Sequence, residues 1–153
     1  TLRNNLTFYQ PDATEEEIIE ALDMVGLTSL VAELPEGLDA FVGEGGRSLS
    51  GGQSQRVALA RAVLHRTCRV LVFDEPTAHL DIETEWELKQ RMLPLMEGKL
   101  VFFATHRLHW LSEMDEILLL ENGRVEDFGS FDSLSEANSF SYLANSRKEG
   151  GDE

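Results

Sequence analysis

Two continuous apolar runs constrain the fold of this 153-residue chain more than any other feature of its sequence. Segments 69–74 (RVLVFD) and 99–105 (KLVFFAT) lack the alternation of polar and apolar residues typical of a strand with one solvated face. We therefore expect two fully buried strands. Between them, Asp81 begins a helical pattern, and Pro94 is expected to strain or end its last turn. This alternation predicts an α/β fold with a mostly parallel sheet.

Local signals predict the remaining elements. Thr14 and Glu17 have capping-box spacing, and Gly26 is a plausible stop for the helix that they begin. Ser50 is expected to cap a helix over 51–64, and Asn122-Gly123 is typical of a hairpin turn. We also expect short helices at 28–34, 108–112, 130–136 and 139–146, a glycine-rich connection at 41–48, and strands at 116–121 and 124–128.

The composition excludes several classes of protein. Thirteen Lys and Arg against 28 Asp and Glu give a net charge of −15, which opposes approach to nucleic acid or to anionic lipid. The single cysteine, Cys68, cannot form an internal disulfide, and no apolar run reaches the roughly 20 residues that span a bilayer. The chain begins at Thr1 without a signal peptide pattern, so we expect it to be a segment of a longer chain.

The first candidate functional element is the pentapeptide at the start of the helix over 51–64. A helix N-terminus attracts phosphate through free N–H groups and the positive end of the helix dipole. Two glycines leave the backbone accessible to an anion, and a serine hydroxyl adds a hydrogen-bond donor. The alternative is a glycine turn before a well-capped helix. The pentapeptide consists of Leu49, Ser50, Gly51, Gly52 and Gln53.

The second candidate element is the pair of carboxylates, Asp74 and Glu75, that ends the first predicted strand. Ligands of open α/β sheets bind at the carboxyl ends of the strands. One carboxylate there can hold Mg²⁺, while its neighbour orients or deprotonates an attacking water. The alternative is a buried strand that ends in solvated acids. Pro76 favours a sharp exit of the chain from the sheet.

Two further residues gain weight from their order in the chain. Asp81 is the last residue of the segment that follows the carboxylates. Taken by itself, an aspartate there predicts only a helix N-cap. His106 follows the second predicted strand and would lie at the same sheet edge as Glu75 if the two strands are neighbours. The other histidines, His65, His79 and His109, are expected to be surface or packing residues. No Cys/His cluster indicates a transition-metal site.

Together these elements resemble the ATP-binding-cassette (ABC) family of P-loop NTPase-like ATPases. Residues 49–53 (LSGGQ) are similar to its signature motif, and 70–75 (VLVFDE) to its Walker B strand. Residues 76–81 (PTAHLD) resemble its D-loop, and 104–107 (ATHR) its switch-histidine loop. The resemblance implies one nucleotide-binding domain over 1–146, of which 1–64 would be a helical-subdomain remnant with the signature helix. Residues 65–146 would hold the other motifs, and 147–153 a polar tail.

The resemblance also implies roles for the motif residues, ATP and Mg²⁺ as cofactors, and a second cassette as partner. Asp74 would hold Mg²⁺, Glu75 would be the general base, and His106 would contact the γ-phosphate of ATP bound to the same chain. The pentapeptide at 49–53 would close on the γ-phosphate bound by the partner cassette, and Asp81 would communicate across the interface.

One departure from the family pattern limits what this chain can do alone. No G-x-x-x-x-G-K-[ST] phosphate-binding loop is present, because Gly98-Lys99 has no glycine at the required spacing. We therefore expect a cassette truncated at its N-terminus and inactive by itself. A non-catalytic interaction fragment is the competing interpretation.

Segments 1–6 (TLRNNL) and 42–46 (VGEGG) resemble those of exporter cassettes that follow a membrane domain. This likeness implies an ATPase at the cytoplasmic face of the membrane, joined to transmembrane domains and binding no nucleic acid. More narrowly, segments 42–53 and 104–111 are similar to the heterodimeric thiol exporters of cytochrome bd assembly.

Overall fold

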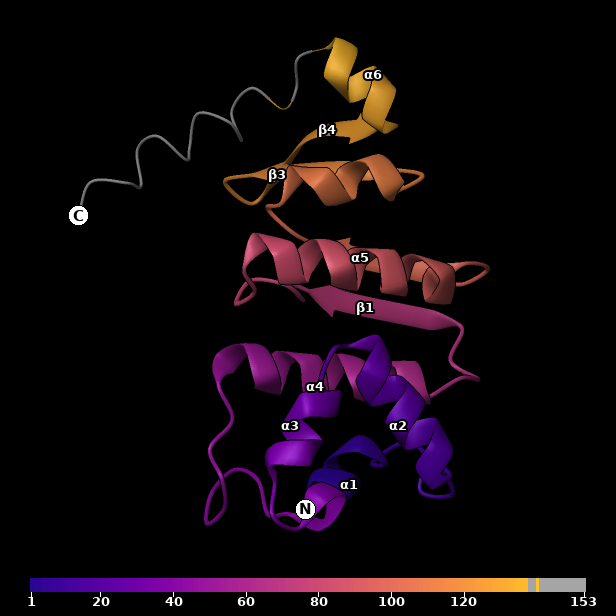
Figure 1. The fold of residues 1–153 in the computed structure, drawn as a ribbon. Helices are drawn as coiled ribbons and strands as arrows, with labels where there is room; N and C mark the ends of the chain where they lie inside the picture. Colours follow the sequence, from indigo (N-terminus) through magenta and orange to yellow (C-terminus); the bar gives the residue numbers. More distant parts are fainter. Residues whose placement is uncertain (138–139, 141–153) are drawn as a thin grey trace, which may run out of the picture. The chain divides into compact units, whose positions relative to one another are not determined.

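A computed structural model describes residues 1–137 and 140 of the chain. The chain divides into two compact units, Thr1–Ala104 and Thr105–Glu153, and each is described by itself. The first unit contains a group of helices (Figure 1) and a parallel strand pair. The second contains an antiparallel hairpin and two short helical segments. The predicted mixed α/β class with a parallel sheet is confirmed.

The helical part of the first unit contains α1 (Leu2–Leu6), α2 (Glu15–Met24), α3 (Thr28–Glu33) and the 3₁₀ segment η1 (Gly37–Asp39). The predicted capping box at the start of α2 is present, and Gly26 has a positive φ of 66°, as a helix stop requires. The core of this group consists mainly of buried leucines and isoleucine, which are Leu2, Leu6, Ile18, Leu22, Leu27 and Leu30.

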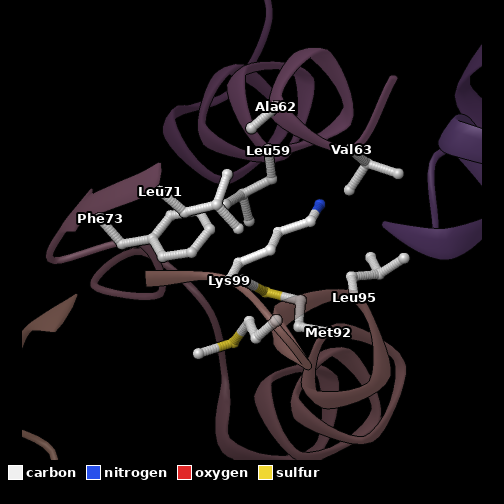
Figure 2. A pocket seen from close by; sticks show the side chains of 9 residues that line it. Leu59, Ala62, Val63, Leu71, Phe73, Met92, Leu95 and Lys99 are labelled. Atoms are coloured by element: carbon white, nitrogen blue, oxygen red, sulfur yellow. The ribbon is translucent and has the colours of Figure 1, made fainter. Parts of the chain in front are cut away.

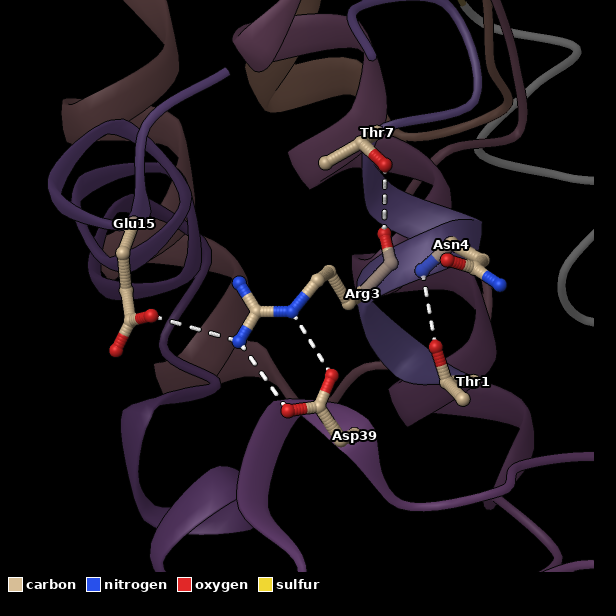
Figure 3. Close-up of polar contacts among 6 residues, drawn as sticks. All are labelled: Thr1, Arg3, Asn4, Thr7, Glu15 and Asp39. Atoms are coloured by element: carbon tan, nitrogen blue, oxygen red, sulfur yellow. Dashed lines mark hydrogen bonds and ion pairs between the residues drawn. The ribbon is translucent and has the colours of Figure 1, made fainter. Parts of the chain in front are cut away.

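Arg3 joins three of these segments at the surface. Its Nε donates to Asp39 in η1 at 2.9 Å, and its Nη2 lies 3.4 Å from a carboxylate oxygen of Glu15 in α2 (Figure 3). The hydrogen bond from the Arg3 guanidinium is the largest cause that lowers the pKa of the Asp39 carboxyl, and desolvation opposes it. These contacts fix the first turn of the chain beside α2 and η1.

The signature-containing helix α4 (Gly51–Leu64) packs against α1 and α2 (Figure 1). Its buried side chains are Val57, Leu59, Ala60 and Leu64. Arg61 donates from Nε to the carbonyl of Asn5 at 2.7 Å, which ties the middle of α4 to the end of α1. The predicted bounds of this helix and its Ser50 cap are confirmed.

Strands β1 (Val70–Asp74) and β2 (Leu100–Ala104) pair in parallel, with Val70 opposite Leu100 and Asp74 opposite Ala104. The connection between them contains α5 (Ile82–Met96). Leu71 and Phe73 of β1 point toward a small apolar pocket lined by residues of α4 and α5, across which the stem of Lys99 extends (Figure 2). One face of β1 is therefore packed against helices.

The prediction that both strands are fully buried is wrong. Val72 is 72% exposed and Phe102 is 56% exposed, and burial alternates along β1. The helices α4 and α5 cover the side that carries Leu71 and Phe73, and in the described part of the chain the opposite side remains open. An apolar run shows that both faces suit burial, but not that both are covered.

Pro94 does not end α5, which continues for two residues beyond it to Met96. Pro94 therefore lies in the last turn of α5, as expected, although the helix does not end at the proline itself. Gly98, with a positive φ of 70°, then turns the chain toward β2.

The second unit contains η2 (Leu108–Glu113), β3 (Ile117–Glu121), β4 (Arg124–Gly129) and α6 (Phe131–Glu136). The predicted short helix near 108–112 is a 3₁₀ helix. Asn122 and Gly123 both have positive φ, 49° and 74°, which confirms the predicted hairpin turn. The predicted helix at 139–146 and the tail at 147–153 lie outside the described residues, except for Phe140. Leu111, Ile117, Leu119 and Leu134 form a buried apolar cluster in this unit.

Candidate functional site

The N-terminus of α4 is built by a reciprocal capping box. The Ser50 hydroxyl accepts from the backbone N–H of Gln53 at 3.1 Å, and the Gln53 side-chain oxygen accepts from the Ser50 N–H at 2.9 Å. Because the hydroxyl oxygen only accepts in this box, its own proton stays able to donate to a ligand. The spacing Ser-x-x-Gln is the local sequence signal for this arrangement.

The first turn of α4 has an electrostatic character suited to anions. It contains no acidic residue, and it begins with Gly51 and Gly52. The positive end of the helix dipole is therefore not neutralised by a neighbouring carboxylate in that turn. Gly51 is exposed and Gly52 is half-buried, so the backbone at the helix start is reachable from solvent.

The two glycines also admit the loop that follows β1. A Cβ atom on Gly51 would lie 3.3 Å from the His79 ring, and one on Gly52 would lie 3.1 Å from the His79 carbonyl oxygen. A side chain at either position would require this loop to shift by a few tenths of an ångström. His79 is exposed and packs against Gly51, as expected of a surface or packing residue. No local pattern of residues indicates this close approach.

The chain turns at Glu75, the second of the two candidate carboxylates at the end of β1. Asp74 is exposed, whereas Glu75 is half-buried and has a φ of +46°, in the left-handed region. The Glu75 N–H still donates to the Ala104 carbonyl at 2.9 Å, which extends the pairing with β2 by one bond. The positive φ breaks the strand alternation, so the expected turn at the strand end is present.

Gln55 was not among the predicted site residues. From α4, its side-chain nitrogen donates to the Glu75 carbonyl at 2.6 Å, and its side-chain oxygen accepts from the His79 N–H at 3.4 Å. These contacts join residues 20 and 24 positions apart in the chain. No local pattern could have indicated them.

Asp81 caps α5. Its carboxylate accepts from the backbone N–H of Thr84 at 2.9 Å and from the Thr84 hydroxyl at 2.7 Å. The backbone bond is the larger cause that lowers the pKa of the Asp81 carboxyl, with the hydroxyl bond second. Within the same loop, the buried Thr77 hydroxyl donates to Glu85 in α5. The loop between β1 and α5 is therefore fixed at both of its ends.

His106 follows β2 by two residues and is exposed. It belongs to the second compact unit, whereas Asp74 and Glu75 belong to the first. The juxtaposition of His106 and Glu75 therefore stays a prediction.

The carboxylates at the end of β1 suit a metal ion for which water and phosphate, rather than the protein, supply most of the ligands. Among residues 1–137 and 140, no group of three or more His, Cys, Asp or Glu side chains gathers as a metal cage. An exposed carboxylate such as Asp74 fits Mg²⁺, which binds through one or two carboxylates together with substrate phosphates. No helix in the described part of the chain is long and apolar enough to cross a bilayer.

Comparison with known proteins gives consistent matches. A family model described as ABC transporter matches residues 1–78. The chain is 58% identical over 138 residues to the glutathione/L-cysteine transport system ATP-binding/permease protein CydC of Bacillus subtilis, covering 90% of this chain and 24% of that protein. It is 38% identical over 134 residues to the cyclolysin secretion/processing ATP-binding protein CyaB of Bordetella pertussis, covering 88% of this chain and 19% of that one.

A solved structure of a bacterial Atm1-family ABC exporter with ATP bound matches with a TM-score of 0.81 and 32% sequence identity. The match covers 96% of this chain and 26% of that one. The chain therefore spans about a quarter or less of the length of these similar proteins.

Proposed function

The chain belongs to the ABC transporter family, and from this premise we propose that it is the C-terminal part of an exporter's ATP-hydrolysing cassette. ATP hydrolysis by the whole protein would drive transport across a membrane, with the cassette at the cytoplasmic face. The similar proteins named ATP-binding/permease support this proposal, as does the exporter structure with ATP bound. The phosphate-binding loop that the 153 residues lack would lie elsewhere in the whole protein.

Within one cassette, Asp74, Glu75 and His106 would serve the ATP bound to their own chain. Asp74 would hold Mg²⁺, which supplies charge neutralisation on the phosphates when bound. Glu75 would accept a proton from the attacking water as its oxygen bonds to the γ-phosphorus and the bond to ADP breaks. His106 would donate a hydrogen bond to the γ-phosphate.

Across a dimer of cassettes, the helix start at Leu49–Gln53 would act on the other chain's nucleotide. Ser50 would donate its free hydroxyl proton to the γ-phosphate, and the N–H groups of Gly51 and Gly52 would supply positive potential there. Asp81 would communicate between the two sites from the start of α5. The site would be complete only when two cassettes close on ATP, so binding could drive a movement that hydrolysis reverses.

One observation supports the proposal above the others. The uncharged, glycine-containing start of α4 lies in contact with the loop that follows the two carboxylates, through Gly51, Gly52 and His79. An ordinary helix cap does not require two glycines at that contact. Two glycines are required when the helix start must accept both an anion and a neighbouring loop.

The direct test is Glu75→Gln in the whole protein. Glutamine keeps the shape of the side chain but accepts no proton at neutral pH, so we expect ATP binding within a few-fold of wild type and hydrolysis slower by about 100-fold or more. Nucleotide binding and single-turnover hydrolysis would be measured on the same preparation. Hydrolysis within a few-fold of wild type would remove Glu75 from the role of base.

The 58% identity to a protein named for glutathione and L-cysteine transport supports a low-molecular-weight thiol as the exported substrate. Inverted membrane vesicles that contain the whole protein and its partner should accumulate labelled glutathione or cysteine in the presence of ATP. The absence of ATP-dependent accumulation of either labelled thiol would contradict this assignment.

A further inference from the structure

Gln55 connects α4 to the loop after β1 at two points. Its side-chain nitrogen donates to the Glu75 carbonyl at 2.6 Å, and its side-chain oxygen accepts from the backbone N–H of His79 at 3.4 Å. The first bond is short and the second is long, so the contact with Glu75 is the stronger one. Gln55 itself is half-buried.

The Glu75 backbone is the part of this loop with the greatest need for support. Its φ of +46° lies in the left-handed region, which is unfavourable for a residue other than glycine. Its N–H donates to Ala104, and its carbonyl accepts from the Ala78 N–H at 3.2 Å as well as from Gln55. The Gln55 amide therefore helps to fix the peptide after Glu75, and it comes from a different element.

Because Gln55 belongs to α4, its side chain links the start of that helix to the loop after β1. Gln55 lies on the same rigid helix as Ser50, Gly51 and Gly52, about one turn from the helix start. A displacement of the start of α4 must therefore move the group that holds the Glu75 carbonyl. Gly52 also lies close to the His79 carbonyl, since a Cβ atom there would stand 3.1 Å from its oxygen, so the same displacement would reach His79 as well.

We infer that Gln55 is a positioning residue, which sets the orientation of Glu75 according to where α4 lies. This inference rests on the proposed function, in which the start of α4 closes on the nucleotide of the partner cassette. Closure on one ATP would then align the general base at the other ATP, through a path that lies inside a single chain.

The test uses the whole protein with Gln55→Met, which keeps an unbranched side chain of similar length and removes both hydrogen bonds. We expect ATP affinity and KM within a few-fold of wild type, with single-turnover hydrolysis slower by about 10- to 100-fold, as for a displaced catalytic group. Gln55→Glu is the second variant, because it can still accept from the His79 N–H but cannot donate to Glu75 when ionised. It should be slowed in the same direction.

Arg61→Met is the matched control. It removes the bond of 2.7 Å from α4 to the Asn5 carbonyl while leaving the contacts of Gln55 intact. If Gln55 acted only by holding α4 in the fold, the two methionine variants would lose hydrolysis to a similar extent. We expect Arg61→Met to stay within a few-fold of wild type.

A double variant separates positioning from general stability. Once Glu75→Gln has removed the base, Gln55→Met should cause no further loss of hydrolysis, because it acts through Glu75. Multiplied losses in the double variant, or normal turnover of both Gln55 variants, would overturn the inference about Gln55. Normal turnover of Glu75→Gln alone would instead overturn the proposed function.

Discussion

The starts of α4 and α5 have the same backbone geometry and opposite electrostatics. Ser50 and Asp81 occupy the cap positions with φ and ψ of −64° and 162°, and of −68° and 161°. Each cap accepts from an N–H three residues further on, from Gln53 and Thr84. The α5 start carries a carboxylate cap and acidic residues in its first turn, whereas the α4 start carries none.

This difference shows that the positive end of a helix dipole can either be neutralised by a charged cap or stay available for a ligand. At α5 the positive end of the dipole is already met by Asp81, and the hydrogen bonds from Thr84 lower the pKa of that carboxyl. At α4 the same need for a cap is met by a neutral hydroxyl, so the positive potential stays available. The start of α5 thus has the charge of a structural cap, whereas the start of α4 has that of the proposed phosphate site.

The largest effect is expected when the α4 cap is made like that of α5. Ser50→Asp keeps a good N-cap but places a carboxylate where the partner's γ-phosphate would dock. We expect the whole protein to hydrolyse ATP about 100- to 1000-fold more slowly at the site that uses this helix, because a donor is lost and repulsion is added. Ser50→Asn, which caps without charge, is the control and should lose much less. Equal losses in both variants would contradict the role of charge.

A smaller effect is expected when the α4 cap is removed without adding charge. Ser50→Ala eliminates the acceptor for the Gln53 N–H, which is worth about 1 kcal/mol of helix stability. Amides in the first turn of α4 should exchange with deuterium faster, by about fivefold, and hydrolysis should fall by less than in Ser50→Asp. Unchanged exchange at residues 51–57, measured by mass spectrometry of peptides, would show that the capping box contributes little.

The smallest effect at neutral pH is expected at the α5 cap. The pKa of Asp81 is lowered in the folded state, so its contribution to stability is full above its unfolded value and is lost as pH falls through the lower folded value. Asp81→Asn keeps a good cap but carries no charge and does not titrate. Its thermal midpoint should lie slightly below wild type at pH 7 and decline less steeply than wild type between about pH 4 and pH 2, so that the two approach each other in acid. Parallel curves for both proteins would contradict the assignment of that titration.

Local signals predicted the elements that depend on a few neighbouring residues. Ser50 and Asp81 were identified as caps, and Asn122-Gly123 as a turn, because each acts within three or four positions of itself. The sequence did not predict the contacts of Gln55 or His79, which depend on how α4 meets a loop about 20 residues later. It also overestimated the burial of Val72 and Phe102, because composition cannot show which face of a sheet is covered.

The open face of the two-stranded sheet has a consequence for temperature. Val70 and Val72 on β1 and Leu100 and Phe102 on β2 are exposed, and the strands that carry them are paired. A partner that covered these four side chains would be held mainly by the release of ordered water, and that driving force weakens on cooling. Association through this face should therefore loosen in the cold and tighten on moderate warming, unlike contacts dominated by hydrogen bonds.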